Sequence, residues 1–333
     1  MIVSGYAAPA AKEALVPFTY EPAPLGPKDV EVEITHCGIC HSDIHLIDND
    51  WSTSVYPLVP GHEIVGRIVA RGDECALSPG QRVGIGWQRS ACLQCEQCLA
   101  GRENLCPTQQ ATCVRHKGGF ATHIRTDSRF VFPLPEALES AATAPLLCGG
   151  ATVFAPIRRW GVGPGAHVGI VGLGGLGHLA LRFLRAMGCR VTVFTSSSTK
   201  RDEALHLGAE SAVSSVTPRE IRAFTSRLDF VLCTVPARLD WVGYLQTLKP
   251  NGVFCLVGAP PGLIQFPASL LLTGQRVVCG SDIGSPGVIR EMLAFATEHR
   301  IGAQVEIVPM SEVNAALARV RQNLVRYRMV LTN

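Results

Sequence analysis

Residue types that bind metals and carry protons cluster near the start of the chain. The stretch from Cys37 to His45 holds two thiols, two imidazoles, a hydroxyl and a carboxylate, and the turn Gly61-His62-Glu63 follows it. Cys, His and Glu are side chains that zinc prefers, and a zinc ion held by three of them keeps a fourth position for a substrate oxygen. The pattern predicts a reaction centre in which zinc polarises a carbonyl while a hydroxyl and an imidazole move the proton.

A second group of cysteines has the spacing of a closed metal site. Cys92, Cys95, Cys98 and Cys106 follow the pattern C-x2-C-x2-C-x7-C. Four thiolates at such spacing hold zinc in a tetrahedron. All-cysteine sites are structural, so we expect the lobe of residues 88–110 to stabilise the fold rather than to catalyse. Unpaired thiols or a disulfide are the alternatives. A nucleic-acid-binding finger is disfavoured, because acidic side chains oppose the few cations nearby.

A glycine-rich turn indicates a dinucleotide site in the second half of the chain. Residues 167–171 form an apolar run typical of a buried strand, and a helix is expected over residues 178–187. The G-x-G-x-x-G turn between them lets the backbone approach a pyrophosphate at a helix N-terminus. An ordinary glycine turn is the alternative, but a second strand over residues 190–194 completes the βαβ context. The loop residues expected at the cofactor are Gly172, Gly174, Gly175, Leu176 and Gly177.

The end of that second strand discriminates between the two nicotinamide cofactors. NAD-binding proteins carry Asp or Glu there for the ribose 2′-hydroxyl. This chain has hydroxyls and cations instead, which would bind a 2′-phosphate through charge-assisted hydrogen bonds. The pattern favours NADP(H), with an incidental polar loop as the alternative. The residues expected at the phosphate are Ser196, Ser197, Ser198, Lys200 and Arg201.

The composition limits the classes of protein to which this chain can belong. The chain has 333 residues, of which 47% are hydrophobic, and a net charge of +3 without a basic run, which disfavours a nucleic-acid partner. We see no leader pattern, and no apolar stretch reaches the ~20 residues that span a bilayer, so no membrane partner is expected. An odd count of 13 cysteines, four of them at metal spacing, favours a reducing cytoplasm over disulfides.

The elements that position these residues fall into two architectures. Period-two alternation predicts antiparallel strands in a β-rich domain over residues 1–150. Strands then alternate with helices over residues 151–285, which predicts a doubly wound parallel sheet of the Rossmann type and an α/β fold class. Residues 286–333 are expected to return to the first domain, with Ser311 capping a helix over residues 311–321.

The motifs occur in an order that resembles the zinc-dependent medium-chain alcohol dehydrogenases. Cys40-His41-Ser42-Asp43-Ile44-His45, Gly61-His62-Glu63, the four-cysteine lobe, the run Pro145 to Gly150 and the glycine loop carry the resemblance, which covers essentially the whole chain. The Ser-Ser-Ser-x-Lys loop and residues 325–331 resemble the cinnamyl alcohol dehydrogenase branch. Within it, residues 48–51, 84–87 and 145–150 resemble the bacterial NADPH-dependent broad-range aldehyde reductases. The resemblance implies a GroES-like first domain and a homodimer formed through the sheet edge near residues 264–282.

The resemblance also implies roles at the metal. Cys40, His62 and Cys148 would ligate the catalytic zinc, with Glu63 just behind it and Asp43 orienting the imidazole. From spacing alone, Cys148 is one of several lone cysteines. With the four-cysteine lobe, the resemblance implies two Zn²⁺ per chain.

The same resemblance assigns the remaining site residues. Ser42 and His45 would relay the proton. Besides the glycine loop and the phosphate loop, the expected cofactor contacts are His41, Thr152, Thr234, Val257, Ser281, Ile283 and Arg328. The expected substrate pocket is Leu46, Trp51, Thr53, Trp87 and Asp282. A carboxylate at position 282 departs from the family and would either bind a hydroxylated substrate or point to solvent.

These expectations combine into one reaction. We predict reversible hydride transfer between NADP(H) and aldehydes or primary alcohols, with aromatic or medium-chain substrates suited to the two Trp side chains. The alternatives are an NAD-dependent polyol or sugar dehydrogenase and a non-enzymatic zinc-binding relative with metal in the cysteine lobe only. The cysteines without an assigned role, expected as buried thiols, are Cys37, Cys75, Cys113, Cys189, Cys233, Cys255 and Cys279.

Overall fold

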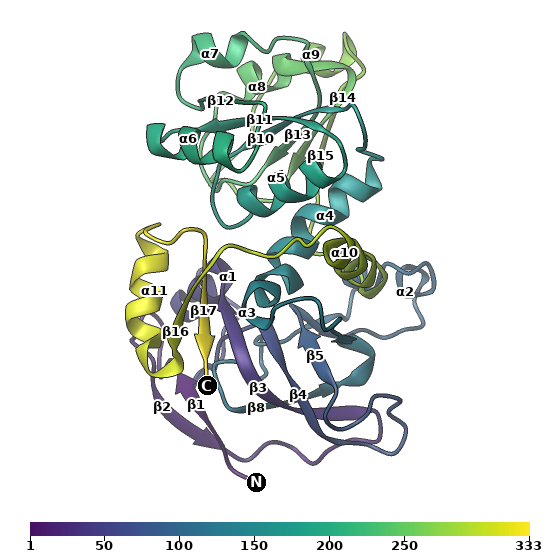
Figure 1. The fold of residues 1–333 in the computed structure, drawn as a ribbon, viewed down its shortest axis with the longest axis vertical. Coiled ribbons are helices and arrows are strands. Elements are labelled where there is room, and N and C mark those ends of the chain that lie inside the picture. Colours follow the sequence, from purple (N-terminus) through teal and green to yellow (C-terminus); the bar gives the residue numbers. More distant parts are fainter. The chain divides into compact units, whose positions relative to one another are not determined.

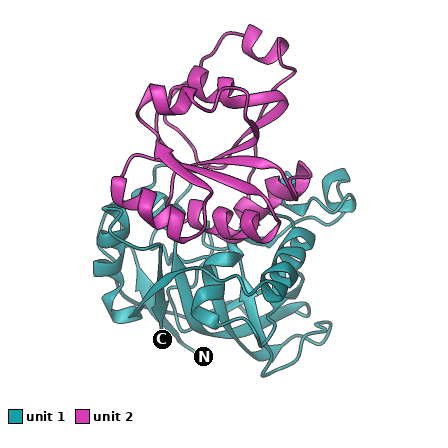
Figure 2. Ribbon diagram, turned by 45° about the horizontal axis from the view of Figure 1, so that its top comes forward, with its two compact units in different colours: residues 1–148, 284–333 teal, residues 149–283 magenta.

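The contacts within the chain divide it into two compact units. The computed structural model describes all 333 residues. Unit 1 comprises Met1–Cys148 together with Gly284–Asn333, and unit 2 comprises Gly149–Ile283 (Figure 2). The metal-ligand candidates therefore fall in unit 1 and the glycine loop falls in unit 2.

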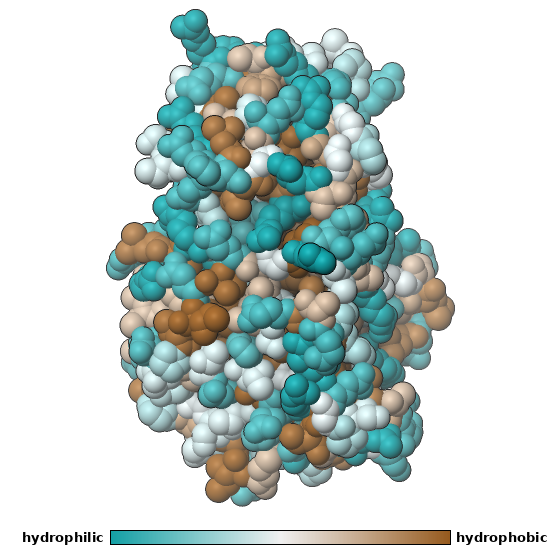
Figure 3. Space-filling view, viewed as in Figure 1, coloured by the Kyte–Doolittle hydropathy of each residue, from teal (hydrophilic) through white to brown (hydrophobic).

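No single helix is long and apolar enough to cross a membrane, although the bent pair Ser140–Leu147 and Gly149–Arg159 reaches that length and composition when taken together. On the face drawn in Figure 3, hydrophilic residues surround small groups of hydrophobic ones.

Unit 1 is built on a seven-stranded sheet in the order β16-β17-β3-β4-β5-β9, with β8 also paired to β3 (Figure 1). All of these pairings are antiparallel except that of β16 with β17. The strands of unit 1 are β1 (Val3–Ala7), β2 (Val16–Tyr20), β3 (Asp29–Ile39), β4 (Glu63–Arg71), β5 (Arg82–Ile85), β6 (Gln88–Ser90), β7 (Gln110–Ala111), β8 (His123–Asp127), β9 (Val131–Pro133), β16 (Val305–Pro309) and β17 (Arg328–Thr332). Its helices are α1 (His41–Asp48), α2 (Glu96–Leu99), α3 (Ser140–Thr143), α10 (Pro286–Glu298) and α11 (Val313–Arg321), with short 3-10 turns η1 (Glu103–Leu105), η2 (Ser128–Phe130), η3 (Ala144–Leu147) and η4 (Met310–Glu312).

The central strand β3 delivers the first metal-ligand candidate. Its β-branched residues Val30, Val32 and Ile34 are buried in the core of unit 1 and suit a pleated, packed surface. The strand ends at Ile39, and Cys40 is the N-cap residue of α1. The rigid sheet thus fixes where α1 begins and, with it, the position of the Cys40 thiol.

Unit 2 is a six-stranded parallel sheet in the order β12-β11-β10-β13-β14-β15, the order of a Rossmann fold. The five residues of β10 (His167–Val171) are all buried, as expected for a parallel strand covered on both faces. The predicted α/β fold class, a Rossmann sheet with a β-rich partner, is confirmed. The other strands are β11 (Arg190–Thr195), β12 (Ser211–Ser214), β13 (Leu228–Cys233), β14 (Leu248–Leu256) and β15 (Val277–Gly280). The helices are α4 (Gly149–Arg159), α5 (Gly177–Ala186), α6 (Ser198–His206), α7 (Pro218–Arg222), α8 (Trp241–Thr247) and α9 (Ser269–Leu272).

One local prediction was wrong. Ser311 does not cap α11, because it lies inside the 3-10 turn η4, and the helix begins only at Val313. The N-cap position belongs to Glu312, whose side chain makes no capping hydrogen bond. The turn satisfies the backbone locally, so the hydroxyl signal at residue 311 was misleading.

Candidate active site

Four donor atoms converge in unit 1 from distant parts of the sequence. Cys40, His62, Glu63 and Cys148 each offer one ligand atom, and these atoms all lie within 4.8 Å of one another. His62 and Glu63 are fully buried, and Cys148 is nearly so. The residue before β4 supplies the imidazole and the first residue of β4 supplies the carboxylate. The N-cap of α1 supplies one thiol, and the residue after η3 supplies the other.

The spacing of these donors fits a tetrahedral metal. The sulfurs of Cys40 and Cys148 are 4.0 Å apart, and His62 Nε2 lies 3.3 Å from the Cys148 sulfur. A tetrahedral zinc with Zn–S bonds of about 2.3 Å separates two sulfurs by about 3.8 Å. A hydrogen bond from the Cys148 thiol lowers the pKa of Cys40 well below its usual range, which favours the thiolate that metals bind. The donor set therefore fits zinc in type and in spacing.

The carboxylate of Asp43 forms hydrogen bonds that hold the metal-ligand candidates in place. Its Oδ1 lies 3.0 Å from His62 Nδ1 and accepts a hydrogen bond of 2.9 Å from the Gly61 backbone N–H. Its Oδ2 accepts a hydrogen bond of 2.9 Å from the backbone N–H of Cys40. Because Nδ1 is held by a buried carboxylate, Nε2 is the nitrogen that faces the Cys148 sulfur.

Glu63 lies between the metal-ligand candidates and a buried cation. Its Oε1 accepts a hydrogen bond from Arg328 on β17, and both side chains are buried. Its Oε2 is buried without a hydrogen-bond partner. Burial is the main cause that raises the pKa of Glu63 to about 7, against the opposing charge of Arg328. A Cβ atom on Gly38 would strike Oε2, so a glycine is needed beside the carboxylate.

A half-exposed face of α1 carries hydroxyl and imidazole groups. Ser42 and His45 are three residues apart on the helix and therefore neighbours on its surface. His45 Nδ1 lies 2.7 Å from Asp50 Oδ2, and the His45 ring lies 5.2 Å from the ring of Trp51. Sequence reasoning missed Asp50, although an acid five residues after a relay histidine was a usable signal. The His45–Asp50 pair leads from α1 toward solvent, because about a third to a half of each side chain is exposed.

Two tryptophans lie beside the cluster of metal-ligand candidates. Trp87 packs edge-on against His62 with ring centroids 4.8 Å apart, and Trp51 lies 6.1 Å from Trp87 in a T-shaped arrangement. Trp51 remains 44% exposed. These two predicted pocket residues thus form an apolar wall beside the metal-ligand candidates. Of the other pocket candidates in unit 1, Leu46 is fully buried in the core, and Thr53 is exposed.

The four-cysteine lobe has the geometry of a second metal site. The ligand atoms of Cys92, Cys95, Cys98 and Cys106 also lie within 4.8 Å of one another. Cys92 lies 3.9 Å from Cys98 and 3.5 Å from Cys106, sulfur to sulfur, which again fits tetrahedral zinc. Around these residues only the short elements α2 and η1 are formed, so the lobe has little regular structure of its own.

The glycine loop of unit 2 leaves room at the N-terminus of α5. A Cβ atom on Gly174 would meet no atom within 4 Å, so the space in front of this residue is open. A Cβ atom on Gly177 would instead strike the carbonyl oxygen of Gly172, so close packing of helix and strand requires glycine there. These are the two roles of glycine in dinucleotide-binding loops, namely approach of a phosphate and tight strand-to-helix packing.

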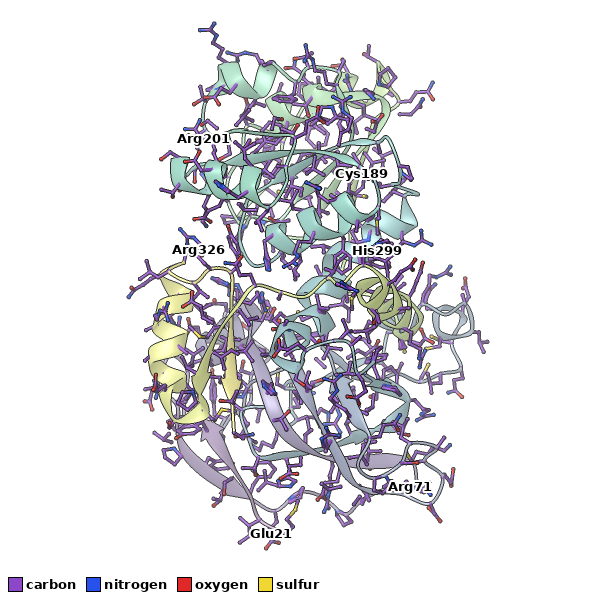
Figure 4. All side chains as sticks on the ribbon, viewed as in Figure 1. Glu21, Arg71, Cys189, Arg201, His299 and Arg326 are labelled. Atoms are coloured by element: carbon purple, nitrogen blue, oxygen red, sulfur yellow. The ribbon has the colours of Figure 1, made fainter.

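The predicted phosphate loop lies at the start of α6. Ser197 is the N-cap residue of α6, and its hydroxyl accepts a hydrogen bond of 3.4 Å from the Lys200 backbone N–H. Arg201, labelled in Figure 4, has its guanidinium 3.7 Å from the carboxylate of Glu220. Ser196 and Ser198 are exposed. The loop therefore carries hydroxyls and cations without a carboxylate of its own.

The remaining predicted cofactor residues are divided between the units. In unit 2, the Thr234 hydroxyl donates a hydrogen bond of 2.9 Å to the Val171 carbonyl oxygen. The substrate-pocket candidate Asp282 is exposed, and its Oδ1 accepts a hydrogen bond from the Ile283 backbone N–H. Thr152 and Ile283 are buried, while Val257 and Ser281 are half-buried.

In unit 1, His41 is exposed and Arg328 is paired with Glu63, a pairing that sequence reasoning missed.

Sequence reasoning also missed Cys113, whose donor atom lies within 4.8 Å of those of Asp43 and His62. No spacing rule joins this residue to the ligand motifs, because only the fold brings its loop beside them.

Comparison with known proteins identifies the family. The Alcohol dehydrogenase GroES-like domain model matches residues 26–136, and the Zinc-binding dehydrogenase model matches residues 175–298. Aldehyde reductase AdhA of Synechocystis is 44% identical over 336 residues, covering 100% of this chain and 99% of that protein. Probable cinnamyl alcohol dehydrogenase 9 of Arabidopsis thaliana is 40% identical, covering 99% and 94%.

Solved structures agree with these relatives. A cinnamyl alcohol dehydrogenase from Sorghum bicolor superposes with a TM-score of 0.96 at 40% identity, covering 100% of this chain and 98% of that one. CAD from Helicobacter pylori, solved in complex with NADP(H), has a TM-score of 0.93 at 30% identity and the same coverage. As the sequence predicted, the chain belongs to the zinc-dependent medium-chain alcohol dehydrogenases, oxidoreductases of alcohols and aldehydes, in the branch of the cinnamyl alcohol dehydrogenases.

Proposed function

We propose that this protein is an NADP(H)-dependent aldehyde reductase that reversibly interconverts aldehydes and primary alcohols and runs toward reduction in the cell. The observation that carries the proposal is the convergence of Cys40, His62, Glu63 and Cys148 donor atoms within 4.8 Å. Cys40, His62 and Cys148 would hold the catalytic zinc, and Glu63 would stay close behind it. When bound, zinc supplies Lewis-acid stabilisation of the negative charge that develops on the substrate oxygen.

The side chains around the metal would orient the ligands and carry the proton. Asp43 fixes the His62 ring and leaves Nε2 for the metal. The Ser42 hydroxyl would give its proton to the product oxygen, and His45 would restore it from solvent. Asp50 holds His45 Nδ1, so His45 Nε2 is the atom left to exchange that proton.

The substrate preference follows from the wall of aromatic rings. Trp87 contacts the His62 ring, and Trp51 lies against both Trp87 and His45. Planar and apolar surfaces pack well on such rings, whereas a polyol would leave its hydroxyls without partners. We infer that aromatic and medium-chain aldehydes are preferred over sugars.

The choice of cofactor rests on the loop after β11. NADP(H), when bound, supplies or accepts the hydride. The loop has no acid to repel a 2′-phosphate, and Ser196, Ser197, Ser198, Lys200 and Arg201 offer hydroxyls and positive charge. The α5 N-terminus and the open space at Gly174 would take the pyrophosphate.

A charge added at Ser197 tests this assignment. Asp is as good a helix cap as Ser, so Ser197→Asp should keep α6 while repelling the 2′-phosphate. We expect the KM for NADPH to rise at least about tenfold and the KM for NADH to change less than about threefold. Ser197→Asn is the matched control, because it keeps the cap and the volume without the charge. Equal losses for both cofactors would contradict the phosphate assignment.

A panel of substrates tests the activity itself. Purified, zinc-loaded protein would be assayed with cinnamaldehyde, benzaldehyde, hexanal and mannitol, each with both nicotinamide cofactors. NADPH-dependent turnover of the aldehydes supports the proposal. Preferential oxidation of mannitol with NAD would favour the polyol dehydrogenase alternative, and no turnover in any combination would favour a non-enzymatic zinc protein.

We further infer a homodimer in the cytoplasm. β15 is the edge strand of the unit 2 sheet, and nearby Leu263 and Leu272 are about four-fifths exposed. An unpaired edge with exposed apolar side chains is a site for pairing with a second copy. Sedimentation equilibrium should give twice the chain mass. The thirteen free cysteines suit a reducing compartment.

A further inference from the structure

The glycine loop of unit 2 contains a peptide group that side chains of the loop itself cannot hold in place. Gly174 and Gly175 are consecutive, and neither has a Cβ atom. Because glycine adopts positive and negative φ about equally readily, a peptide group between two glycines can rotate at little steric cost. A Cβ atom on Gly174 would meet no atom within 4 Å, so packing around this residue leaves room for the rotation. Another contact has to fix the direction of this peptide group.

A buried imidazole in the first turn of α5 provides that contact. His178 is fully buried, and its Nδ1 lies 3.1 Å from the Gly174 carbonyl oxygen. The backbone N–H of His178 donates a hydrogen bond to the same oxygen, also at 3.1 Å. Since a carbonyl oxygen only accepts hydrogen bonds, Nδ1 is the ring nitrogen that carries the hydrogen. One residue thus supplies two donors to a single oxygen of the loop.

The direction of the Gly174 carbonyl determines where the next N–H points. The peptide bond between Gly174 and Gly175 is trans. In a planar trans peptide the C=O and the N–H that follows it point in opposite directions. Because the carbonyl is directed into the first turn of α5, the Gly175 N–H points out of the helix N-terminus. The reversed peptide would present an oxygen there, which disfavours an anion.

The first part of the loop is held in a similar way from a neighbouring strand. The Thr234 hydroxyl lies 2.9 Å from the Val171 carbonyl oxygen and 3.3 Å from that of Gly172. The Gly172 oxygen also lies where a Cβ atom on Gly177 would be, so it packs against the helix. Carbonyl oxygens along the loop therefore face the protein, which leaves N–H groups for a phosphate.

We propose that His178 is a positioning residue for cofactor binding, which fixes the Gly174–Gly175 peptide so that the Gly175 N–H donates to the pyrophosphate. The inference rests on the proposed function, because it concerns the same dinucleotide site. A fully buried imidazole cannot touch the cofactor, so His178 acts through the backbone alone. It lowers the entropic cost of binding, since the loop has fewer orientations to give up.

Two replacements separate the hydrogen bond from the packing of the ring. His178→Leu fills a similar volume without a donor, whereas His178→Asn keeps an N–H near the position of Nδ1 and leaves space beyond it. We expect the Leu variant to raise the Kd for NADPH at least about tenfold and the Asn variant less than about threefold, although Asn should lower the unfolding temperature more. NADPH fluorescence titration and thermal unfolding of the zinc-loaded full chain measure the two effects. His178→Phe, a ring without a donor, repeats the test if the Leu variant does not fold.

The loss should be confined to the pyrophosphate. NADPH and NADH share this group, so we expect His178→Leu to raise both Kd values by the same factor, within about twofold. Adenosine 2′-monophosphate lacks the pyrophosphate, so its Kd, measured by displacement of NADPH, should stay within about twofold of the parent value. Ser197→Asp should give the opposite pattern, because it acts on the 2′-phosphate.

Leu184→Ala is the matched control for lost stability. Leu184 is fully buried further along the same helix. Its truncation should lower the unfolding temperature and leave the Kd for NADPH within about twofold of the parent value. A role of His178 in stability alone would make the Kd follow the unfolding temperature across all of these variants.

Two results would overturn the proposal. One is a Kd for NADPH of His178→Leu within about threefold of the parent value, and the other is an equal loss of affinity in the Leu and Asn variants. Failure of the proposed function gives a different result. A parent chain that binds neither nicotinamide cofactor rejects both, whereas a parent that binds NADPH no more tightly than its Leu variant rejects only the role of His178.

Discussion

Both oxygens of the Asp43 carboxylate accept hydrogen bonds from residues at or beside the metal-ligand candidates. Oδ1 serves the Gly61 N–H and the His62 ring, and Oδ2 serves the Cys40 N–H. One side chain therefore fixes the backbone of one ligand and the ring of another. Since the carboxylate is fully buried, water cannot replace a lost hydrogen bond without structural change.

Asp43→Asn should loosen the metal site while leaving its ligands in place. The amide NH2 group of Asn would face an N–H donor, so one of the three hydrogen bonds is lost. We expect zinc affinity and kcat/KM each to fall about 10- to 100-fold. Zinc retained after dialysis against a competing chelator measures the first effect, and steady-state kinetics measures the second. Unchanged zinc retention would show that Asp43 does not orient His62.

Asp50→Asn is the matched comparison, because this carboxylate also faces an imidazole but is half-exposed and lies outside the group of metal-ligand candidates. We expect zinc content to stay at the parent level while kcat falls about tenfold, since the uncharged Asn amide holds the His45 ring more weakly than the carboxylate does. A rise in the solvent deuterium isotope effect on kcat would accompany the loss. A parent-like kcat would exclude the His45–Asp50 pair from proton movement.

At the scale of elements, α1 and α11 are joined by an ion pair within unit 1. Arg321 Nη2 donates a hydrogen bond of 2.7 Å to Asp48 Oδ1, and Nη1 donates to Oδ2. The Asp48 carboxylate is largely covered, while the Arg321 guanidinium is 40% exposed. The hydrogen bond from Arg321 is the main cause that lowers the pKa of Asp48. The pair therefore ties the C-terminal end of the helix that carries Ser42 and His45 to the return segment.

Asp48→Asn should make the free energy of unfolding less dependent on pH in acidic solution. Because the folded pKa of Asp48 is lowered, its stabilising effect is fully present above the ordinary aspartate pKa and is lost as pH falls through the folded value. We expect the free energy of unfolding at pH 7 to fall by about 0.5–1 kcal/mol, and the difference from the parent to shrink as pH falls below the ordinary aspartate pKa and through the lower folded value. Urea unfolding at several pH values measures this, and Arg321→Gln completes a double-mutant cycle. Additive effects of the two changes would show that the pair contributes nothing.

The glycine loop offers a prediction at the same scale. Gly174→Ala places a methyl group in open space, whereas Gly177→Ala drives one into the Gly172 carbonyl. We expect the first variant to keep the parent unfolding temperature and to bind NADPH at least about tenfold more weakly. The second should lose several degrees of thermal stability, because helix and strand must separate. Thermal unfolding and NADPH fluorescence titration distinguish them, and parent-like NADPH binding by Gly174→Ala would exclude that space as the pyrophosphate site.

At the scale of the whole molecule, unit 1 carries the catalytic ligand candidates and the four-cysteine lobe, and loss of metal from each should have different effects. We expect two zinc ions per chain. Cys148→Ser should bind one and lose activity while the fold remains. Cys106→Ser should also bind one, but its lobe should become sensitive to proteases within residues 92–106 while turnover at 25 °C persists. Elemental analysis, limited proteolysis and kinetics measure the three effects. A parent chain with zinc in the lobe alone would favour the non-enzymatic alternative.

The sequence predicted what depends on local pattern and on family motifs. Strand and helix alternation was enough for the fold class, and spacing was enough to group Cys92 with the three cysteines that follow it. Contacts across long separations could not be found this way. The Arg328–Glu63 pair and the approach of Cys113 to His62 depend on which strands and loops become neighbours. Cys279 was expected to be buried and is half-exposed, because β15 is the edge strand of its sheet.

The distance along the chain between Glu63 and Arg328, 265 residues, has a consequence for how the protein is made. The ribosome synthesises Glu63 long before Arg328. In the early nascent chain, a buried Glu63 carboxylate would therefore have no cation beside it. Enclosing that charge is unfavourable until β17 joins the sheet beside β3. We therefore expect metal uptake at this cluster to follow release of the polypeptide rather than accompany its emergence.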